Sequence, residues 1–110
     1  MPTDSLGEFE KLVMLAVLRL GPAAYGATIV EELEGRTGRP TSPGAVYVAL
    51  RRLEKKGMVS SRLGDPSPTR GGRPKRFFRV EDGGTEALRR ARSAWDAMSE
   101  GLDTLLETDA

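Results

Sequence analysis

The stretch S-P-G-A-V-Y-V-A-L-R-R-L-E-K-K-G-M-V, residues 42–59, decides the fold because it passes from a helical pattern to a strand pattern. Ser42 is a good N-cap, and Pro43 suits the first helical position, where its missing N–H would be unpaired anyway. The expected buried stripe follows at helical spacing: Val46, Ala49, Leu50 and Leu53. We expect a helix from Pro43 to about Lys56, stopped by Gly57.

After Gly57 the apolar period changes from helical to alternating. One face of the first run carries Val59, Ser61 and Leu63, and after a loop Phe78 and Val80 repeat the pattern. The residues between the runs, 64–74, are rich in glycine and proline. Two alternating runs joined in this way predict a β-hairpin with a long tip.

Two helices are expected before this stretch and one after it. The first runs from about 5 to 20, with the S-x-x-E spacing of a capping box at Ser5 and Glu8, and the second from about 26 to 36. The last is expected over 81–107. Its apolar residues are spaced 3-4-3-4-3, as in a helix that lies against another: Leu88, Ala91, Trp95, Met98, Leu102 and Leu105.

Composition excludes several function classes. The 110-residue chain contains no cysteine and no histidine, so Ser/His, Cys/His and zinc-dependent hydrolysis have no residues to use. We expect no catalytic residues, no metal and no cofactor. The longest mainly apolar run, residues 12–20, is far below the roughly 20 residues of a membrane span. We therefore expect a cytoplasmic protein of one domain, small enough for association to add useful burial.

Positive charge is concentrated in the middle of the chain. The net charge is −2 over residues 1–50, +8 over 51–79 and −5 over 80–110. The basic segment covers the second half of the third helix, the hairpin and its tip. Three helices followed by a hairpin is the order of a winged helix-turn-helix, in which the third helix enters the major groove of DNA. We therefore predict a mainly α fold with a small β-hairpin that binds double-stranded DNA.

Three motifs in this order resemble the PadR family of bacterial transcriptional regulators. They are G-P-A-A-Y-G-A-T-I (21–29), the opening stretch (42–59) and R-G-G-R-P-K-R-F-F-R-V (70–80), and the resemblance spans roughly residues 6–107. It implies a homodimeric winged-helix repressor of the short subgroup, whose single C-terminal helix packs on the partner. Tyr47 matches the family's tyrosine in the recognition helix, whereas Glu81 stands where the family usually has threonine.

Candidate DNA-binding residues fall into three groups. Base reading is assigned to the start of the third helix: Thr41, Ser42, Gly44, Ala45 and Val48. Phosphate contact is assigned to Arg51, Arg52 and Lys55, whose alternative is an ordinary solvated helix face. Tyr47 is either a phosphate contact at the helix edge or a core aromatic residue. The hairpin tip, or wing, adds Arg70, Gly72, Arg73, Lys75 and Arg76; by the resemblance, Arg73, Lys75 and Arg76 match the family's basic wing.

The C-terminal seam carries the second candidate site. Trp95 is the only tryptophan and is expected at a dimer interface with the other seam residues. A sharper alternative is an effector site, in which two copies of Trp95, with Met98 nearby, stack a planar aromatic small molecule. The resemblance supports it, because some multidrug-sensing PadR-like regulators carry a tryptophan in this part of the helix.

These inferences divide the chain into a DNA-binding unit, residues 5–80, and a dimerisation helix, residues 81–107. The predicted function is repression from a near-palindromic operator, relieved by a small molecule. A winged-helix module that binds another protein, with DNA binding secondary or lost, is the alternative. An enzyme that used carboxylates alone is the least supported reading.

Overall fold

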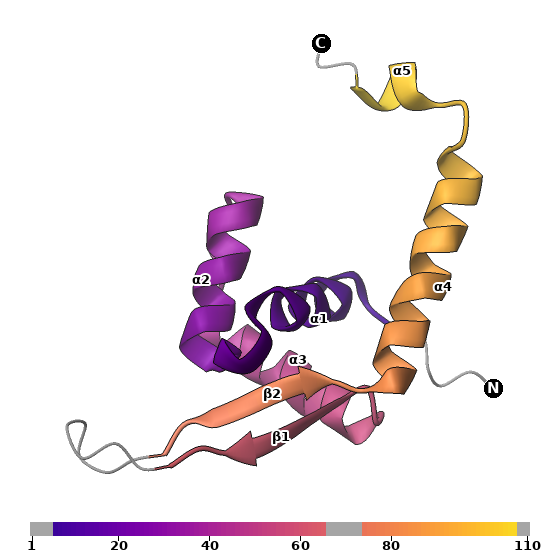
Figure 1. The fold of residues 1–110 in the computed structure, drawn as a ribbon. Coiled ribbons are helices and arrows are strands. Elements are labelled where there is room, and N and C mark those ends of the chain that lie inside the picture. Colours follow the sequence, from indigo (N-terminus) through magenta and orange to yellow (C-terminus); the bar gives the residue numbers. More distant parts are fainter. Residues whose placement is uncertain (1–5, 66–73, 108–110) are drawn as a thin grey trace.

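The computed structural model describes residues 6–65 and 74–107, which form a mainly helical fold with one two-stranded hairpin (Figure 1). The predicted winged helix-turn-helix is confirmed. Its elements are α1 (Glu8–Leu20), the 3-10 turn η1 (Gly21–Ala23), α2 (Gly26–Thr37), α3 (Pro43–Lys55), β1 (Val59–Leu63), β2 (Arg76–Val80), α4 (Asp82–Ser99) and α5 (Asp103–Glu107). The first three helices and the hairpin make a head, from which α4 extends outward.

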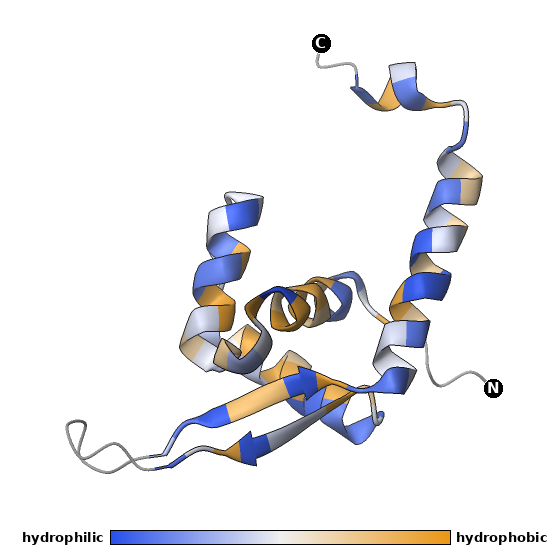
Figure 2. Cartoon of the chain, viewed as in Figure 1, coloured by the Kyte–Doolittle hydropathy of each residue, from blue (hydrophilic) through white to orange (hydrophobic). Residues whose placement is uncertain are grey.

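The core lies where α1, α2 and α3 meet the hairpin. Each helix turns one apolar face inward, and Met14, Ile29 and Leu53 are fully buried there. Figure 2 shows the same division, with hydrophobic residues along α1 and hydrophilic residues on the outer side of α2. Burying a side chain of this size stabilises the fold by about 2 kcal/mol. The opposite face of α3 is exposed to solvent.

The start of α1 differs from the prediction. The helix begins at Glu8 rather than near residue 5, with Gly7 at the N-cap. The Gly7 N–H donates to Glu10 Oε1 at 2.9 Å, so the carboxylate that closes this end is Glu10 and not Glu8. Glu10 is suited to this because it stands at the third helical position, from which a side chain reaches back to the cap. Ser5 lies outside the described residues.

The hairpin is antiparallel, and its register brings Val59 opposite Val80 and Ser61 opposite Phe78. Val59 and Phe78 are buried against the helices, as the alternation predicts. The Phe78 N–H also donates to the Ala24 carbonyl oxygen at 2.9 Å. The returning strand is thus held on one side by β1 and on the other by the segment between η1 and α2.

The C-terminal segment is two helices rather than the single helix expected over 81–107. α4 ends at Ser99, and α5 begins at Asp103. Gly101 between them has φ 83°, a left-handed conformation that glycine adopts at little cost and that interrupts a helix. Leu102 therefore lies in the bend and Leu105 on α5, so the predicted apolar seam does not continue along one axis.

The base of α4 is packed tightly against the turn between α3 and β1. The Glu81 N–H donates to the Met58 carbonyl oxygen at 2.9 Å, and Gly84 is buried beside it. A Cβ at Gly84 would lie 2.4 Å from that carbonyl oxygen and 2.8 Å from Val80 Cγ1. Only glycine allows this approach, which fixes the first turn of α4 to the head.

Candidate nucleic-acid interface

The first turn of α3 presents small, exposed residues on a fixed backbone. Ser42 Oγ accepts the Ala45 N–H at 3.2 Å, and the Thr41 N–H donates to Glu34 Oε2 on α2 at 2.9 Å. Gly44 and Ala45 are exposed. A helix end that is capped and tied to its neighbour in this way has a fixed backbone, from which small exposed side chains project.

Tyr47 and Arg51 form a pair one turn further along α3. The side chain of Tyr47 is 56% exposed, so it is not a core residue. Arg51 NH1 donates to the Tyr47 hydroxyl at 2.8 Å, and its guanidinium carbon lies 5.5 Å from the ring centroid. Because the hydroxyl accepts this bond, its own proton remains to be donated to an acceptor outside the protein.

The last two turns of α3 carry further exposed cations, Arg52 and Lys55. They follow Val48, which is 50% exposed, so the solvent face of α3 changes from small and apolar at its start to basic at its end. The residues predicted to read bases lie at the small, apolar start of this face, and the residues predicted to contact phosphates lie toward its basic end.

A partly buried ion pair lies at the end of α3. Lys56 Nζ lies 2.9 Å from Glu10 Oε1, which connects this end of the helix to the start of α1. Burial raises the pKa of Glu10, but the bonds from Gly7 and Lys56 and the charges of Lys56 and Arg52 together hold it below its ordinary value. Glu10 therefore stays ionised in the folded protein at neutral pH.

The arginines of β1 and β2 lie on two different faces of the hairpin. Arg76 shares the face of Phe78, toward α3, and its NH1 donates to Ser61 Oγ at 3.0 Å. Arg62 and Arg79 are on the other face. The guanidinium of Arg62 lies 5.2 Å from the centroid of Phe77, and Arg79 Nε lies 3.3 Å from Glu81 Oε2. Strand alternation therefore distinguishes the arginine beside α3 from those turned away.

The Glu81 carboxylate has a second partner besides Arg79. Ser60 donates a hydrogen bond to its carboxylate, and this bond, together with the charge and hydrogen bond of Arg79, outweighs the opposing effect of desolvation and lowers the pKa of Glu81. The departure from the usual threonine at this position leaves the start of α4 intact, because the helix begins at Asp82 with Glu81 at its N-cap.

Three predicted DNA-binding residues from two distant parts of the chain meet at one hollow. It has a volume of about 580 Å³, lies between α2, α3 and β2, and is lined in part by Tyr47, Lys75 and Arg76. Lys75 Nζ is 4.5 Å from the ring centroid of Tyr25, a residue that the sequence reasoning did not select. The remaining wing residues, Arg70, Gly72 and Arg73, lie outside the described residues.

A second surface lies between α1 and α4 and is called here the α1–α4 groove. Its volume is about 540 Å³, and its apolar lining consists of Leu12, Leu15, Leu18, Leu88, Ala91 and Trp95. Trp95 is 67% exposed, and Met98, one turn further along α4, is 80% exposed. Leu15 and Leu18 were missed from the sequence because they belong to a helix that also has a fully buried face.

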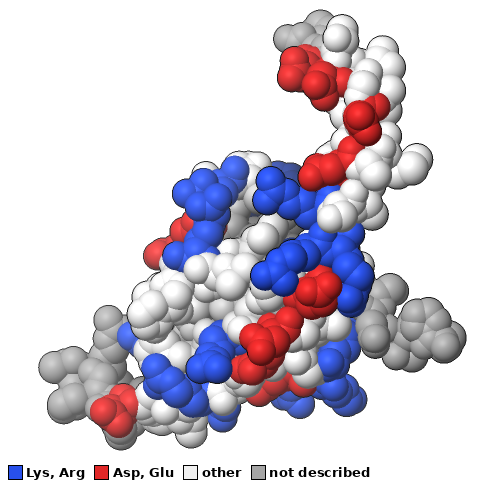
Figure 3. Space-filling view, turned by 45° about the vertical axis from the view of Figure 1, so that its right-hand side comes forward, with Lys and Arg blue, Asp and Glu red and all other residues white. Residues whose placement is uncertain are grey.

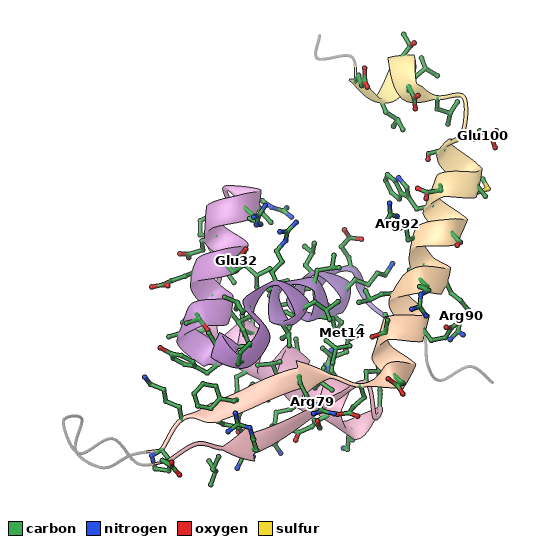
Figure 4. All side chains as sticks on the ribbon, in the orientation of Figure 1. Met14, Glu32, Arg79, Arg90, Arg92 and Glu100 are labelled. Carbon is green, nitrogen blue, oxygen red and sulfur yellow. The ribbon has the colours of Figure 1, made fainter. Side chains whose placement is uncertain are left out.

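Charge is divided along α4 and α5. Three arginines lie near the middle of α4, where they pair with Glu86 and Asp96, and acidic residues predominate toward the far end: Arg89, Arg90 and Arg92 against Asp96, Glu100, Asp103 and Glu107. Figure 3 shows the acidic side chains gathered at that far end. Figure 4 shows Arg92 on the side of α4 toward the head and Arg90 on the opposite side. Arg92 belongs to the α1–α4 groove.

The transcriptional regulator PadR-like family model matches residues 14–90. Among solved structures, a PadR family transcriptional regulator from Eggerthella lenta has 30% sequence identity and a TM-score of 0.68, over 93% of this chain and 88% of that chain. A PadR-like transcriptional regulator from Bacillus cereus shares the fold, with 21% identity and a TM-score of 0.71 over 92% of this chain and 93% of that one.

A further structural neighbour was solved with DNA. Bacillus subtilis PadR in complex with operator DNA has 20% identity and a TM-score of 0.62, over 76% of this chain and 47% of that chain. The comparison with curated proteins gave no match. Within the part of the chain that the structure describes, no helix is both long enough and apolar enough to cross a membrane.

Proposed function

Because the chain belongs to the PadR-like family of transcriptional regulators, we propose that it is a repressor that binds a near-palindromic DNA operator as a homodimer. The observation that carries the DNA-binding part is the exposed basic face shared by α3 and the wing. Tyr47 lines one hollow there together with Lys75 and Arg76, although Tyr47 is far from the other two in the sequence. Convergence of this kind provides a positive surface that follows a phosphate backbone.

In this proposal the first turn of α3 enters the major groove. Thr41, Ser42, Gly44, Ala45 and Val48 then lie nearest the bases. Two hydroxyls offer hydrogen bonds, and the small apolar side chains fit against thymine methyl groups. The exposure and rigid capping of this turn support the assignment.

Phosphate contact is assigned to the residues that surround this turn. On α3 these are Arg51, Arg52 and Lys55, with Tyr47 donating its hydroxyl proton. On the wing they are Lys75 and Arg76, together with the predicted contacts Arg70, Gly72 and Arg73. The operator-bound relative from Bacillus subtilis supports this docking through its similar fold.

The dimer is proposed to form through the C-terminal segment, residues 81–107, which leaves residues 5–80 as the DNA-binding unit. The assigned residues are Leu88, Ala91, Trp95, Met98, Leu102 and Leu105. An antiparallel pair of α4 helices would set the arginines near the middle of each helix against the acidic end of the other. It would also cover Trp95 and Met98, which are exposed in the single chain. The two recognition helices would lie about 34 Å apart, one turn of DNA.

Regulation is proposed to involve a planar aromatic small molecule at Trp95 and Met98. Trp95 already lines the α1–α4 groove, so a ligand bound there would touch both the dimer helix and the head. Quenching of tryptophan fluorescence by a panel of planar cationic and phenolic compounds tests this, because Trp95 is the only tryptophan. If no compound in the panel quenches the fluorescence, Trp95 has a structural role only.

A salt titration tests the proposed function itself. If all seven cationic contacts assigned to each subunit form, log K for the dimer should fall with log[salt] with a slope of about −13. A nearly flat plot would contradict the phosphate contacts. Selection of bound sequences from a random duplex library tests specificity. No enrichment over unselected DNA would favour a module that binds another protein.

A further inference from the structure

Three side chains from three elements form a relay at the root of the wing. Ser61 Oγ on β1 donates to Glu54 Oε2 on α3 at 2.6 Å, and Arg76 NH1 on β2 donates to Ser61 Oγ at 3.0 Å. Glu54 and Ser61 are half-buried, whereas Arg76 is exposed. The relay therefore runs from the recognition helix to a cation on the surface of the wing.

The hairpin register produces this arrangement. Ser61 pairs with Phe78, and Leu63 pairs with Arg76, so Ser61 and Arg76 are diagonal neighbours on the same face of the sheet. Diagonal neighbours are within reach of a long side chain. The face is the one turned toward α3, since Phe78 is buried on it, and Glu54 therefore meets the same hydroxyl.

The direction of the two hydrogen bonds fixes the roles. A serine hydroxyl has one proton, and here Glu54 accepts it, so the lone pairs of the oxygen are turned to Arg76. The bond from Arg76 uses one guanidinium N–H of five. Among the described residues, Arg76 has no acidic partner at ion-pair distance, unlike Arg79, which is paired with Glu81. The relay therefore holds the Arg76 guanidinium through a neutral hydroxyl, and no carboxylate in the described part of the chain contacts it directly.

We infer that Ser61 is a positioning residue for DNA binding, which holds the Arg76 guanidinium beside α3 so that it meets a backbone phosphate with little loss of conformational freedom. Glu54 orients the Ser61 hydroxyl for this purpose. The inference rests on the proposed function, because it needs Arg76 to contact DNA. A side chain already held in its bound geometry loses less entropy on binding, which appears as affinity.

A double-mutant cycle tests the inference. The affinity for a fluorescein-labelled duplex of random sequence is measured by anisotropy for the wild type, Ser61→Ala, Arg76→Ala and the double variant. We expect Ser61→Ala to weaken binding about fivefold in the wild type, an energy typical of one hydrogen bond. In the Arg76→Ala background the same substitution should have no further effect, because no guanidinium remains to be positioned.

Two more variants distinguish positioning from a general effect on folding. Ser60→Ala removes the neighbouring hydroxyl, which bonds Glu81 on the opposite face, and should leave the affinity unchanged. Ser61→Thr keeps a hydroxyl in a strand and should restore binding. The inference would be overturned if Ser61→Ala reduced the affinity equally with and without Arg76. It would also be overturned if Ser61→Ala left the affinity unchanged while Arg76→Ala reduced it. Either result would leave the proposed function standing. A wild type without salt-dependent binding would overturn both.

Discussion

Lys56 Nζ lies 2.9 Å from Glu10 Oε1, which joins the C-cap residue of α3 to the first turn of α1. The two side chains are 25% and 10% exposed. Replacing Lys56 by methionine would leave a largely buried carboxylate without its partner. We expect Lys56→Met to lower the free energy of unfolding by about 2 kcal/mol at neutral pH.

This loss should depend on pH in a defined direction. The folded pKa of Glu10 is lowered, so the pair contributes fully above the ordinary value of 4.5 and is lost as the pH falls through the folded pKa. Urea unfolding at neutral and at acidic pH measures this, and the difference between wild type and Lys56→Met should shrink in acid. Lys55→Met, at an exposed neighbouring position, is the control. A difference that is the same at both pH values would contradict the prediction.

Gly84→Ala tests the close packing at the base of α4. The new Cβ would meet the Met58 carbonyl oxygen, which belongs to the backbone and cannot turn away, so we expect a loss of about 3 kcal/mol in the free energy of unfolding. Gly83→Ala is a matched control on the same helix, because its nearest atom would be 3.9 Å away. It should change stability by less than about 0.5 kcal/mol. Similar effects at both positions would refute the packing argument.

Tyr47→Phe removes only the hydroxyl that accepts the bond from Arg51. Because the side chain is 56% exposed, stability should change by less than about 0.5 kcal/mol. Affinity for a labelled duplex should fall about fivefold, since both the hydroxyl contact and the orientation of Arg51 are lost. Anisotropy and urea unfolding measure the two quantities. Unchanged affinity at low salt would show that the pair does not contact DNA.

Arg76→Ala and Arg79→Ala remove the same charge from opposite faces of β2. We expect the slope of log K against log[salt] to become shallower by about 1.8 for Arg76→Ala, because two phosphate contacts are lost in a dimer. Arg79→Ala should leave the slope nearly unchanged, since Arg79 is turned away from α3 and paired with Glu81. Equal effects of the two substitutions would mean that the wing acts only through its total charge.

Trp95→Glu should separate the proposed dimer without unfolding the head, because Trp95 is 67% exposed in the single chain. We expect the dissociation constant of the dimer to rise about a hundredfold, as for an aromatic residue at the centre of an interface. Sedimentation over a range of protein concentrations measures it. Ser93→Glu, on another side of α4, is the control. A wild type that sediments as a monomer throughout would contradict the dimer.

Much of the head could be predicted from local signals. Ser42, Pro43 and Gly57 mark the two ends of one helix, and α3 runs from Pro43 to Lys55 as those signals predict, within one residue. The change from a helical to an alternating period likewise located β1 and β2. These features follow from the backbone preferences of single residues and from the pattern of apolar positions. Both signals can be recognised in the sequence alone.

The errors and omissions have a different origin. The apolar spacing of the last segment continues through Gly101, so it predicts one helix even though Gly101 interrupts it. The relay of Glu54, Ser61 and Arg76 depends on hairpin register and on how the sheet packs against α3. Neither is encoded within any single segment. The same holds for Glu10 and Lys56, which are distant in the sequence and meet only when α1 packs on α3.

The buried glycine at the base of α4 has a mechanical consequence. The helix has 18 residues, so it is about 27 Å long, and its first turn cannot move independently of the turn that follows α3. A tilt of about 10° of such a rod relative to a second rod would displace the attached head by about 5 Å, more than the roughly 3.4 Å rise of one base pair. In the proposed dimer, a slight change of angle between the two α4 helices would thus change the separation of the two heads, so that it no longer matches the spacing of their sites on the DNA. No rearrangement inside either head is needed.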